Sequence, residues 1–158
     1  PKDRIVGEPG NGWQQVTSEL AYERSGPERF LSSFRVFVEL VRICGDSPSP
    51  HQAAAIGRIA SHFMTLRRMS LSVAGMLEAG KDVSVEAALV KELGNNFEKL
   101  LPEIARLVVP DLSAVDPDKQ RLVRETFEET LMLSPSFTLR GGTREIMRGV
   151  IARGLGLR

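Results

Sequence analysis

Apolar residues recur at helical spacing along most of this chain. From Val16 to Leu131 they follow one another at steps of three and four, the period of amphipathic α-helices. Beyond the short pair Ile5–Val6, nothing in the chain resembles a strand. Because short polar turns separate the periodic segments, consecutive helices should lie antiparallel. The sequence therefore predicts an all-α, up-and-down helical bundle.

The first two helices are expected over residues 14–44 and 52–77. Pro27 should kink the first, because proline lacks an N–H and crowds the carbonyl four residues back. Gly80 should stop the second. The first helix presents one continuous stripe: Val16, Leu20, Glu23, Pro27, Phe30, Phe34, Phe37 and Val41.

Two further helices are expected after capping residues. Asp82 or Ser84 can cap the third, which Pro102 could bend or split, and Asp116 caps the fourth with Pro117 at its first position. The predicted apolar faces are Ala88, Leu89, Leu93, Phe97, Leu100, Ile104 and Leu107 on the third helix, and Leu122, Phe127 and Leu131 on the fourth.

A glycine pair, Gly141–Gly142, opens the last predicted helix. The Thr143 hydroxyl can cap this helix, and Glu145 places a carboxylate in its first turn, where the helix dipole is positive. Bare N–H groups at such a turn suit an anionic or polar ligand, although an ordinary cap explains the pattern equally well. The apolar positions are Ile146, Val150 and Ile151, and Gly154 and Gly156 end the helix.

Composition narrows the classes of function. The chain has 158 residues, 42% hydrophobic and 26% charged, with a net charge of +1, as expected for one globular domain. That charge gives no reason to expect nucleic acid or a membrane as partner, and no apolar run approaches a membrane span. The single Cys44 indicates a reducing compartment, such as the cytoplasm or the mitochondrial matrix. His51 and His62 lack a ligand set, so no metal is expected.

The C-terminal stretch GGTREIMRGVIARGLGLR resembles the acyl-CoA dehydrogenase family, in which Gly-Gly-Thr-x-Glu-Ile leads to Arg, Ile-Ala and Leu-Gly-Leu. EAALVKEL, at 86–93, is similar to the family's third helix of the C-terminal domain. The start, PKDRIVGEPGNGW, resembles the exit from the family's middle β-domain. The resemblance implies that residues 1–12 are the tail of a β-domain, that 13–158 form the C-terminal helical bundle, and that two domains precede it.

The resemblance also implies a catalytic carboxylate. In many members the base precedes the Gly-Thr of the C-terminal turn, where this chain has Gly141. In other members it is the Glu of a Leu-x-x-Glu-Arg run, which here is Leu20 to Arg24. Glu23 is therefore the candidate base, with Arg24 as its neighbour, and its place on the stripe should turn it into the bundle. A solvated helix carboxylate, or one paired with Arg24 or a facing arginine, is the alternative.

Cofactor contacts follow from the same resemblance. Gly142, Thr143 and Glu145 match the turn that touches FAD across a subunit interface. Two other flavin-binding runs of the family, Arg-x-x-Phe-Gly and Gln-x-x-Gly-Gly, are replaced by GDSPSPHQAAA and LSAVDPDKQ. This chain alone should therefore bind FAD weakly or not at all, and a mixed complex with a partner subunit would suit it.

The expected function is the α,β-dehydrogenation of acyl-CoA thioesters by an FAD-dependent enzyme of which this chain is the C-terminal domain. Its partners would be the acyl-CoA substrate, further subunits of a homo- or hetero-oligomer, and an electron-transferring flavoprotein. The alternatives are a non-catalytic helical oligomerisation module, or a flavin-poor subunit of a mixed acyl-CoA dehydrogenase complex.

Overall fold

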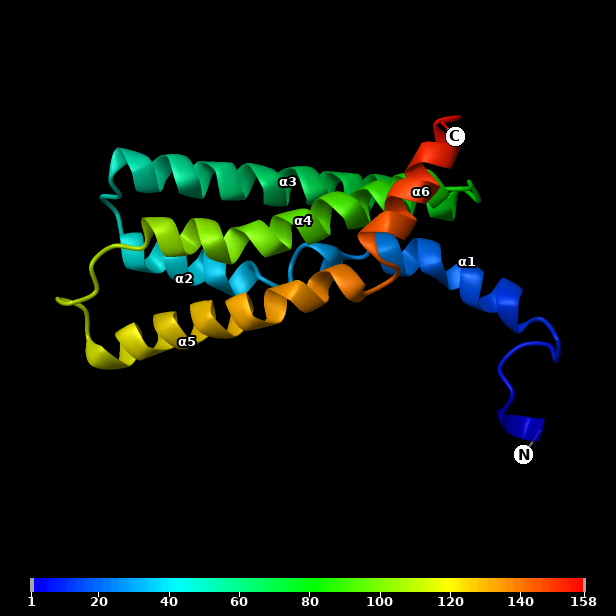
Figure 1. Cartoon of the computed structure of the whole chain (residues 1–158), viewed down its shortest axis with the longest axis horizontal. Helices are drawn as coiled ribbons and strands as arrows, with labels where there is room; N and C mark the ends of the chain where they lie inside the picture. Colours follow the sequence, from blue (N-terminus) through cyan, green and yellow to red (C-terminus); the bar gives the residue numbers. More distant parts are fainter. Residues whose placement is uncertain (1, 158) are drawn as a thin grey trace.

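The computed structural model describes residues 2–157, which fold into helices joined by short connections (Figure 1). No β-strand occurs in this part of the chain, so the all-α prediction is confirmed and Ile5–Val6 is not a strand. Within it lie the 3-10 segments η1 (Lys2–Arg4), η2 (Pro27–Arg29) and η3 (Ser134–Leu139) and the helices α1 (Gly12–Ser25), α2 (Phe34–Cys44), α3 (Pro50–Glu78), α4 (Ser84–Val108), α5 (Pro117–Leu133) and α6 (Arg144–Gly154).

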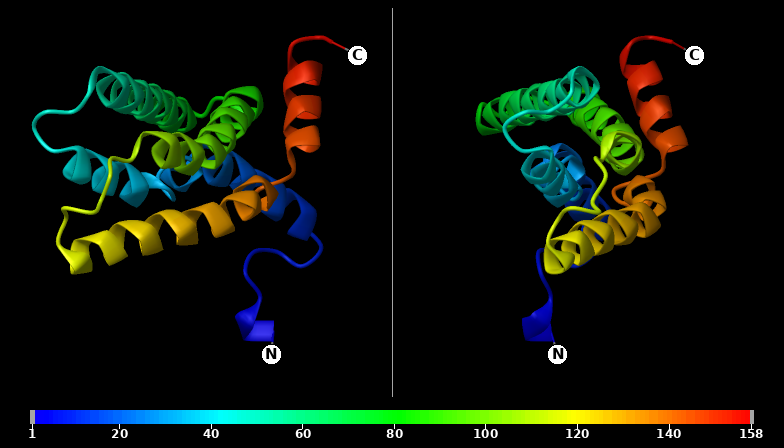
Figure 2. Two further views of the ribbon diagram at one scale, coloured as in Figure 1. Left: turned by 60° about the vertical axis from the view of Figure 1, so that its left-hand side comes forward. Right: turned by 90° about the vertical axis from the view of Figure 1, so that its left-hand side faces the viewer.

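Helices α2 to α5 run up and down, each antiparallel to the next (Figure 1). Helix α4 is central and contacts α1, α2, α3, α5 and α6. Helix α6 stands across the end of the bundle beside α1 and α4 (Figure 2). The main core lies between α2, α3 and α4 and includes Val36, Leu40, Ile59, Phe63, Leu66, Phe97 and Leu101.

The single first helix predicted over 14–44 is wrong, because the chain leaves helical geometry at Gly26. This residue is extended, with φ −63° and ψ 158°, since the ring of Pro27 excludes the helical region for the residue before it. Helix α1 therefore ends at Ser25, and α2 starts only at Phe34. The predicted stripe is not continuous: Val16 is 59% exposed.

Local start and stop signals were predicted in part. The N-cap of α4 is Val83, without a side-chain cap bond, and not Asp82 or Ser84 as predicted, although the Asp82 carboxylate accepts the N–H of Ser84. The cap of α3 was not predicted. The Ser49 hydroxyl accepts the N–H of Gln52 and the Gln52 side chain accepts the N–H of Ser49, a complete capping box at α3. The Asp116 carboxylate accepts the first N–H groups of α5, as predicted. Gly80 follows the end of α3 at φ +67°. Pro102 does not split α4.

The predicted face of α4 is wrong in part, because Leu93, Leu100 and Leu107 are 47%, 57% and 71% exposed. The helix instead buries its polar residues Lys91, Asn95 and Glu98 completely. Partners far along the chain make the burial of Lys91 and Glu98 possible, and hydrophobic periodicity carries no information about such partners. Despite the exposed leucines, no helix in residues 2–157 has both the length and the apolar composition needed to cross a bilayer.

Smaller shifts of face occur in α5 and α6. Helix α5 buries Val123 and Thr126, while Leu122 from its predicted face is 36% exposed. Helix α6 buries Met147, while Ile146 is 53% exposed. Val123 and Met147 each lie one residue after a predicted position, and Thr126 lies one residue before Phe127, because the face that packs is set by where neighbouring helices approach.

Candidate functional site

The Gly141–Gly142 turn joins η3 to α6 and forms the centre of the candidate site. Both glycines have positive φ, +65° and +102°, which a residue with a side chain rarely adopts. Two cationic side chains bind the carbonyls of the turn. Arg24 Nε of α1 donates to Gly141 O at 3.1 Å, and Lys91 Nζ of α4 donates to Gly142 O. The turn is thus held from two helices.

Glu23 lies against the same turn. A Cβ atom placed on Gly141 would be 3.0 Å from Glu23 Oε1, so the carboxylate occupies the space where a side chain at position 141 would begin. The two base positions suggested by the sequence therefore meet in space, although 118 positions separate them in the chain. Glu23 is not buried in the bundle as predicted, because its side chain remains 41% exposed.

Arg29 of η2 binds Glu23 twice. Its Nη2 donates to Glu23 Oε1 at 2.9 Å and its Nε donates to the Glu23 backbone carbonyl at 2.8 Å. Arg29 is itself buried, and its Nη1 has no partner among the described residues. The facing arginine anticipated as one alternative is therefore Arg29, while Arg24 binds the turn. Burial lowers the pKa of Arg24 and the charge of Glu23 opposes that change.

Lys91 is a member of the site that sequence reasoning missed. It is fully buried, and desolvation lowers its pKa to about 8. The positive charges of Arg29 and Arg24 act in the same direction, and Glu92 and Glu23 oppose them. One signal could have indicated it: Lys91 lies between Ala87, Ala88 and Gly94, small residues that allow other elements to approach α4 closely.

Ion pairs hold η3 and α6 on the central helix. Arg144 and Arg148 both donate to Glu92 Oε1, at 3.3 and 3.2 Å. Arg140 Nη2 donates to the buried Glu98 Oε2 at 3.0 Å. Burial raises the pKa of Glu98, and the hydrogen bonds from Ser32 together with Arg140 counteract part of this rise. The residues that flank the glycine turn are thus fixed to α4 on both sides.

Thr143 and Glu145 start α6 as predicted, but in a different arrangement. Thr143 occupies the N-cap position, yet its hydroxyl caps no N–H group within residues 2–157. Hydrogen bonds from the Glu145 backbone N–H and the Thr143 hydroxyl lower the pKa of the exposed Glu145 carboxyl. The predicted cap is therefore wrong, whereas the acidic residue in the first turn is correct.

The histidines and the cysteine considered in the sequence analysis lie outside the glycine turn. No group of three or more His, Cys, Asp or Glu residues there could hold a metal. His62 stacks on Phe97 with 5.0 Å between ring centroids. Cys44 is half-buried, and this burial raises the pKa of its thiol.

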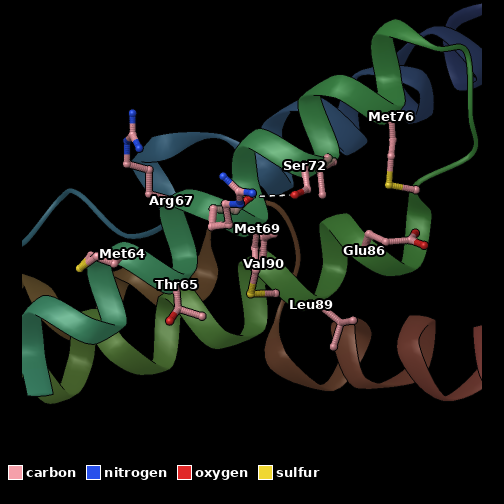
Figure 3. A pocket seen from close by; sticks show the side chains of 11 residues that line it. Met64, Thr65, Arg67, Met69, Ser72, Met76, Glu86, Leu89 and Val90 are labelled. Atoms are coloured by element: carbon pink, nitrogen blue, oxygen red, sulfur yellow. Dashed lines mark hydrogen bonds between the residues drawn. The ribbon is translucent and has the colours of Figure 1, made fainter.

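An apolar groove of about 680 Å³ lies between α3 and α4, separate from the glycine turn (Figure 3). Met64, Met69 and Met76 line it from α3, and Leu89 and Val90 from α4. None of Glu23, Arg24, Lys91 and the two glycines contributes to its wall. Met64 is 73% exposed, while Met69 and Met76 are partly buried, so the groove adds apolar surface to this face of the molecule.

No protein-family model matches the chain. Two curated proteins do. The chain is 26% identical over 159 residues to "Acyl-CoA dehydrogenase IpdE1" of Mycolicibacterium smegmatis, with 97% of this chain and 38% of that protein covered. It is 28% identical over 162 residues to "Acyl-CoA dehydrogenase FadE29" of Mycobacterium tuberculosis, with 96% and 41% covered. The chain is thus similar to two acyl-CoA dehydrogenases over nearly its whole length. It spans about two fifths of the length of these relatives, and its helical fold agrees with the C-terminal domain of the family.

The start of α6 offers backbone donors for a polar group. No hydrogen bond from the Thr143 N–H to an acceptor is found within residues 2–157. Uncommitted N–H groups at the start of an eleven-residue helix are suited to an anion or a carbonyl oxygen. Gly142, Thr143 and Glu145 could therefore contact FAD through backbone donors and exposed side chains.

The segments that replace the two flavin-binding runs of the acyl-CoA dehydrogenases lie elsewhere. GDSPSPHQAAA forms the α2–α3 connection and the start of α3, and LSAVDPDKQ forms the α4–α5 connection and the start of α5. Both are at the end of the bundle opposite the glycine turn (Figure 1). In a single chain, these segments and the turn are thus well separated.

Proposed function

We propose that this chain is the C-terminal helical domain of an FAD-dependent acyl-CoA dehydrogenase-like enzyme that removes hydrogen from the α and β carbons of an acyl-CoA thioester. Residues 1–12 would be the tail of a preceding β-domain and 13–158 the helical domain. The contact between Glu23 and Gly141 is the observation that carries the proposal. It brings the Leu20-x-x-Glu23-Arg24 carboxylate to the turn at which other members carry their base.

The chemistry assigned to this chain is proton removal. A Glu23 carboxylate oxygen takes the α-proton, and the C–H electron pair remains on the substrate to form the new double bond. FAD, when bound, accepts the β-hydrogen as hydride. The exposed part of Glu23, 41% of its side chain, leaves the carboxylate accessible to a substrate.

Two arginines would orient this base. Arg29 donates hydrogen bonds to both the carboxylate and the backbone carbonyl of Glu23, and these two bonds restrict the orientation of the Glu23 side chain. Arg24 binds the Gly141 carbonyl and so fixes the surface on which the carboxylate rests. Arg24 is then a positioning residue, not a group that exchanges a proton, because an arginine remains protonated in proteins.

A flavin-poor subunit of a mixed complex is the second candidate. The absence of the two flavin-binding runs and the separation of their replacements from the glycine turn favour it. In that arrangement Glu23 would serve a flavin held largely by a partner chain, with Gly142, Thr143 and Glu145 as contacts across the interface. This chain alone would then bind little FAD.

A non-catalytic oligomerisation module is the third candidate. The apolar outer face of α3 and α4 supports self-association for this module and for the two enzyme candidates alike. Leu93 and Leu100, which are 47% and 57% exposed, line a second hollow between α3 and α4 and extend this apolar surface. The proposed partners are an acyl-CoA substrate, further subunits and an electron-transferring flavoprotein. Replacement of Glu23, described next, distinguishes a non-catalytic module from an enzyme that uses Glu23 as its base.

The test is Glu23→Gln in the whole protein, together with its partner subunit if one co-purifies. Gln keeps the shape but cannot accept the proton, so flavin reduction by acyl-CoA should slow by about two orders of magnitude or more. Substrate binding should persist. The matched control is Glu19→Gln, an exposed carboxylate one turn earlier on α1, which should leave the rate unchanged.

Reduction of the Glu23→Gln protein at the wild-type rate would refute the assignment of the base. The chain would then be a scaffold for a base on another subunit. Equal loss in both variants would indicate damage to α1 and would also count against a specific role for Glu23.

A further inference from the structure

The two carbonyl groups of the Gly141–Gly142 turn are bound by cations from different helices. Arg24 approaches from α1 and Lys91 from α4. Helix α4 contacts both α1 and α6, so the turn that precedes α6 is bound where these helices meet α4. Lys91 differs from Arg24 in being fully buried, so its ammonium group has no water to replace the Gly142 carbonyl.

The turn has little freedom to move once Lys91 is in place. A Cβ on Gly142 would lie 3.0 Å from Met147 Cε, so the turn packs on the buried methionine of α6. Its other side meets the Glu23 carboxylate at Gly141. Any displacement of Gly142 is therefore passed directly to the surface against which Glu23 is held.

We propose that Lys91 is a positioning residue for the base: by holding the Gly142 carbonyl, it fixes the glycine turn that sets the place of the Glu23 carboxylate. The inference rests on the proposed function of Glu23. It predicts a defect in the rate of proton removal and not in substrate affinity, because Lys91 is buried beneath the turn.

The charge of Lys91 gives this role a dependence on pH. The charged groups that act on Lys91 are Glu23 and Arg24 of α1, Arg29 of η2 and Glu92 of α4. With desolvation they place its pKa at about 8. Above this pH the amine is neutral and donates a weaker hydrogen bond to the Gly142 carbonyl. Flavin reduction should therefore decline on the alkaline side of about pH 8.

The first experiment is Lys91→Met in the whole protein, with the rate expressed per bound flavin. Misplacement of the base by a fraction of an ångström to 1 Å should slow reduction by about 10- to 100-fold. The substrate dissociation constant should remain close to that of wild type. The matched control is Asn95→Leu, one turn further along α4: Asn95 is equally buried, and its side chain has no hydrogen bond within residues 2–157. It should keep the wild-type rate.

The second experiment compares the pH profiles of wild type and Lys91→Arg. Arginine keeps its charge at alkaline pH, so the decline near pH 8 should disappear in the variant, with much of the rate at neutral pH retained. The wild-type profile is informative even if neither variant folds, since a rate that stays level well above pH 8 would overturn the proposal.

The outcomes separate this inference from the proposed function. A slow Glu23→Gln protein beside a Lys91→Met protein of normal rate would overturn the role of Lys91 alone. A normal Glu23→Gln protein would overturn both. Equal loss of rate in Lys91→Met and Asn95→Leu would show that the defect comes from general disturbance of α4, and would also overturn the role of Lys91.

Discussion

At Gly94, helix α4 packs directly against the backbone of η2, and replacement of this glycine tests the packing beneath the site. A Cβ atom at Gly94 of α4 would lie 2.2 Å from the backbone carbonyl oxygen of Arg29 and 3.0 Å from its carbonyl carbon. An ordinary contact between carbon and a carbonyl oxygen is about 3.3 Å, so the backbone of Arg29 would have to retreat by roughly 1 Å. No rotation of a side chain can relieve this clash.

Two opposing effects decide the change in stability for Gly94→Ala. Alanine in a helix interior is favoured over glycine by about 1 kcal/mol. Overpacking of a buried contact costs about 1–3 kcal/mol, and the backbone atom involved here places the cost at the upper end of that range. We therefore expect Gly94→Ala to destabilise the chain by about 1–2 kcal/mol.

Gly75→Ala is the matched control. Gly75 also lies in a helix interior, on α3, but its Cβ would meet no atom within 4 Å in the described part of the chain. It should therefore stabilise the chain by about 0.5–1 kcal/mol. The two substitutions are chemically identical and should have effects of opposite sign.

Urea unfolding followed by far-UV circular dichroism measures the difference. About 2 kcal/mol between the two variants should separate their midpoints by roughly 1 M urea. In the whole protein, Gly94→Ala should also slow flavin reduction, because the displaced Arg29 holds Glu23. If Gly94→Ala is as stable as Gly75→Ala, α4 and η2 are not in this close contact, and the account of how Arg29 is held is wrong.

Two further predictions concern stability. Ser49→Ala removes a complete capping box and should cost about 1 kcal/mol of unfolding free energy, whereas Thr143→Ala, at an N-cap position without a cap hydrogen bond in the described residues, should stay within about 0.5 kcal/mol; equal losses in urea unfolding would contradict this. Because burial raises the pKa of Glu98 above its ordinary 4.5, its contribution to stability is complete below pH 4.5 and is lost as the pH rises through the folded pKa. The stability of wild type relative to Glu98→Gln should therefore fall between acidic and neutral pH, and a constant or rising difference would refute the burial of a titrating carboxyl there.

Much of the secondary structure could be predicted because its causes are local. The cap at Asp116 and the glycines at 80, 141 and 142 act through hydrogen bonds and backbone angles within a few residues. The all-α class followed from periodicity for the same reason. The break at Gly26–Pro27 is also local, but its depth was underestimated: the restriction that Pro27 places on Gly26 ends the helix instead of kinking it.

Candidate site residues could be named from the sequence, but their arrangement in space could not. The Leu-x-x-Glu-Arg run and the Gly-Gly-Thr turn each drew attention through resemblance, without any indication that Glu23 would touch Gly141. Lys91 was missed because a lysine in a helix is ordinarily exposed. Only the fold places a carbonyl, that of Gly142, against its ammonium group.

The buried face of α4 shows most clearly what the tertiary structure decided. Hydrophobic spacing favoured a face with Leu93 and Leu100, yet the helix buries Lys91 and Glu98. A charged group can be buried only when a partner replaces its water, and these partners lie 51 positions away at Gly142 and 42 positions away at Arg140. The sequence by itself determines where each helix can form, since those interactions span a few residues. Which face is buried depends on contacts that exist only after distant segments have met.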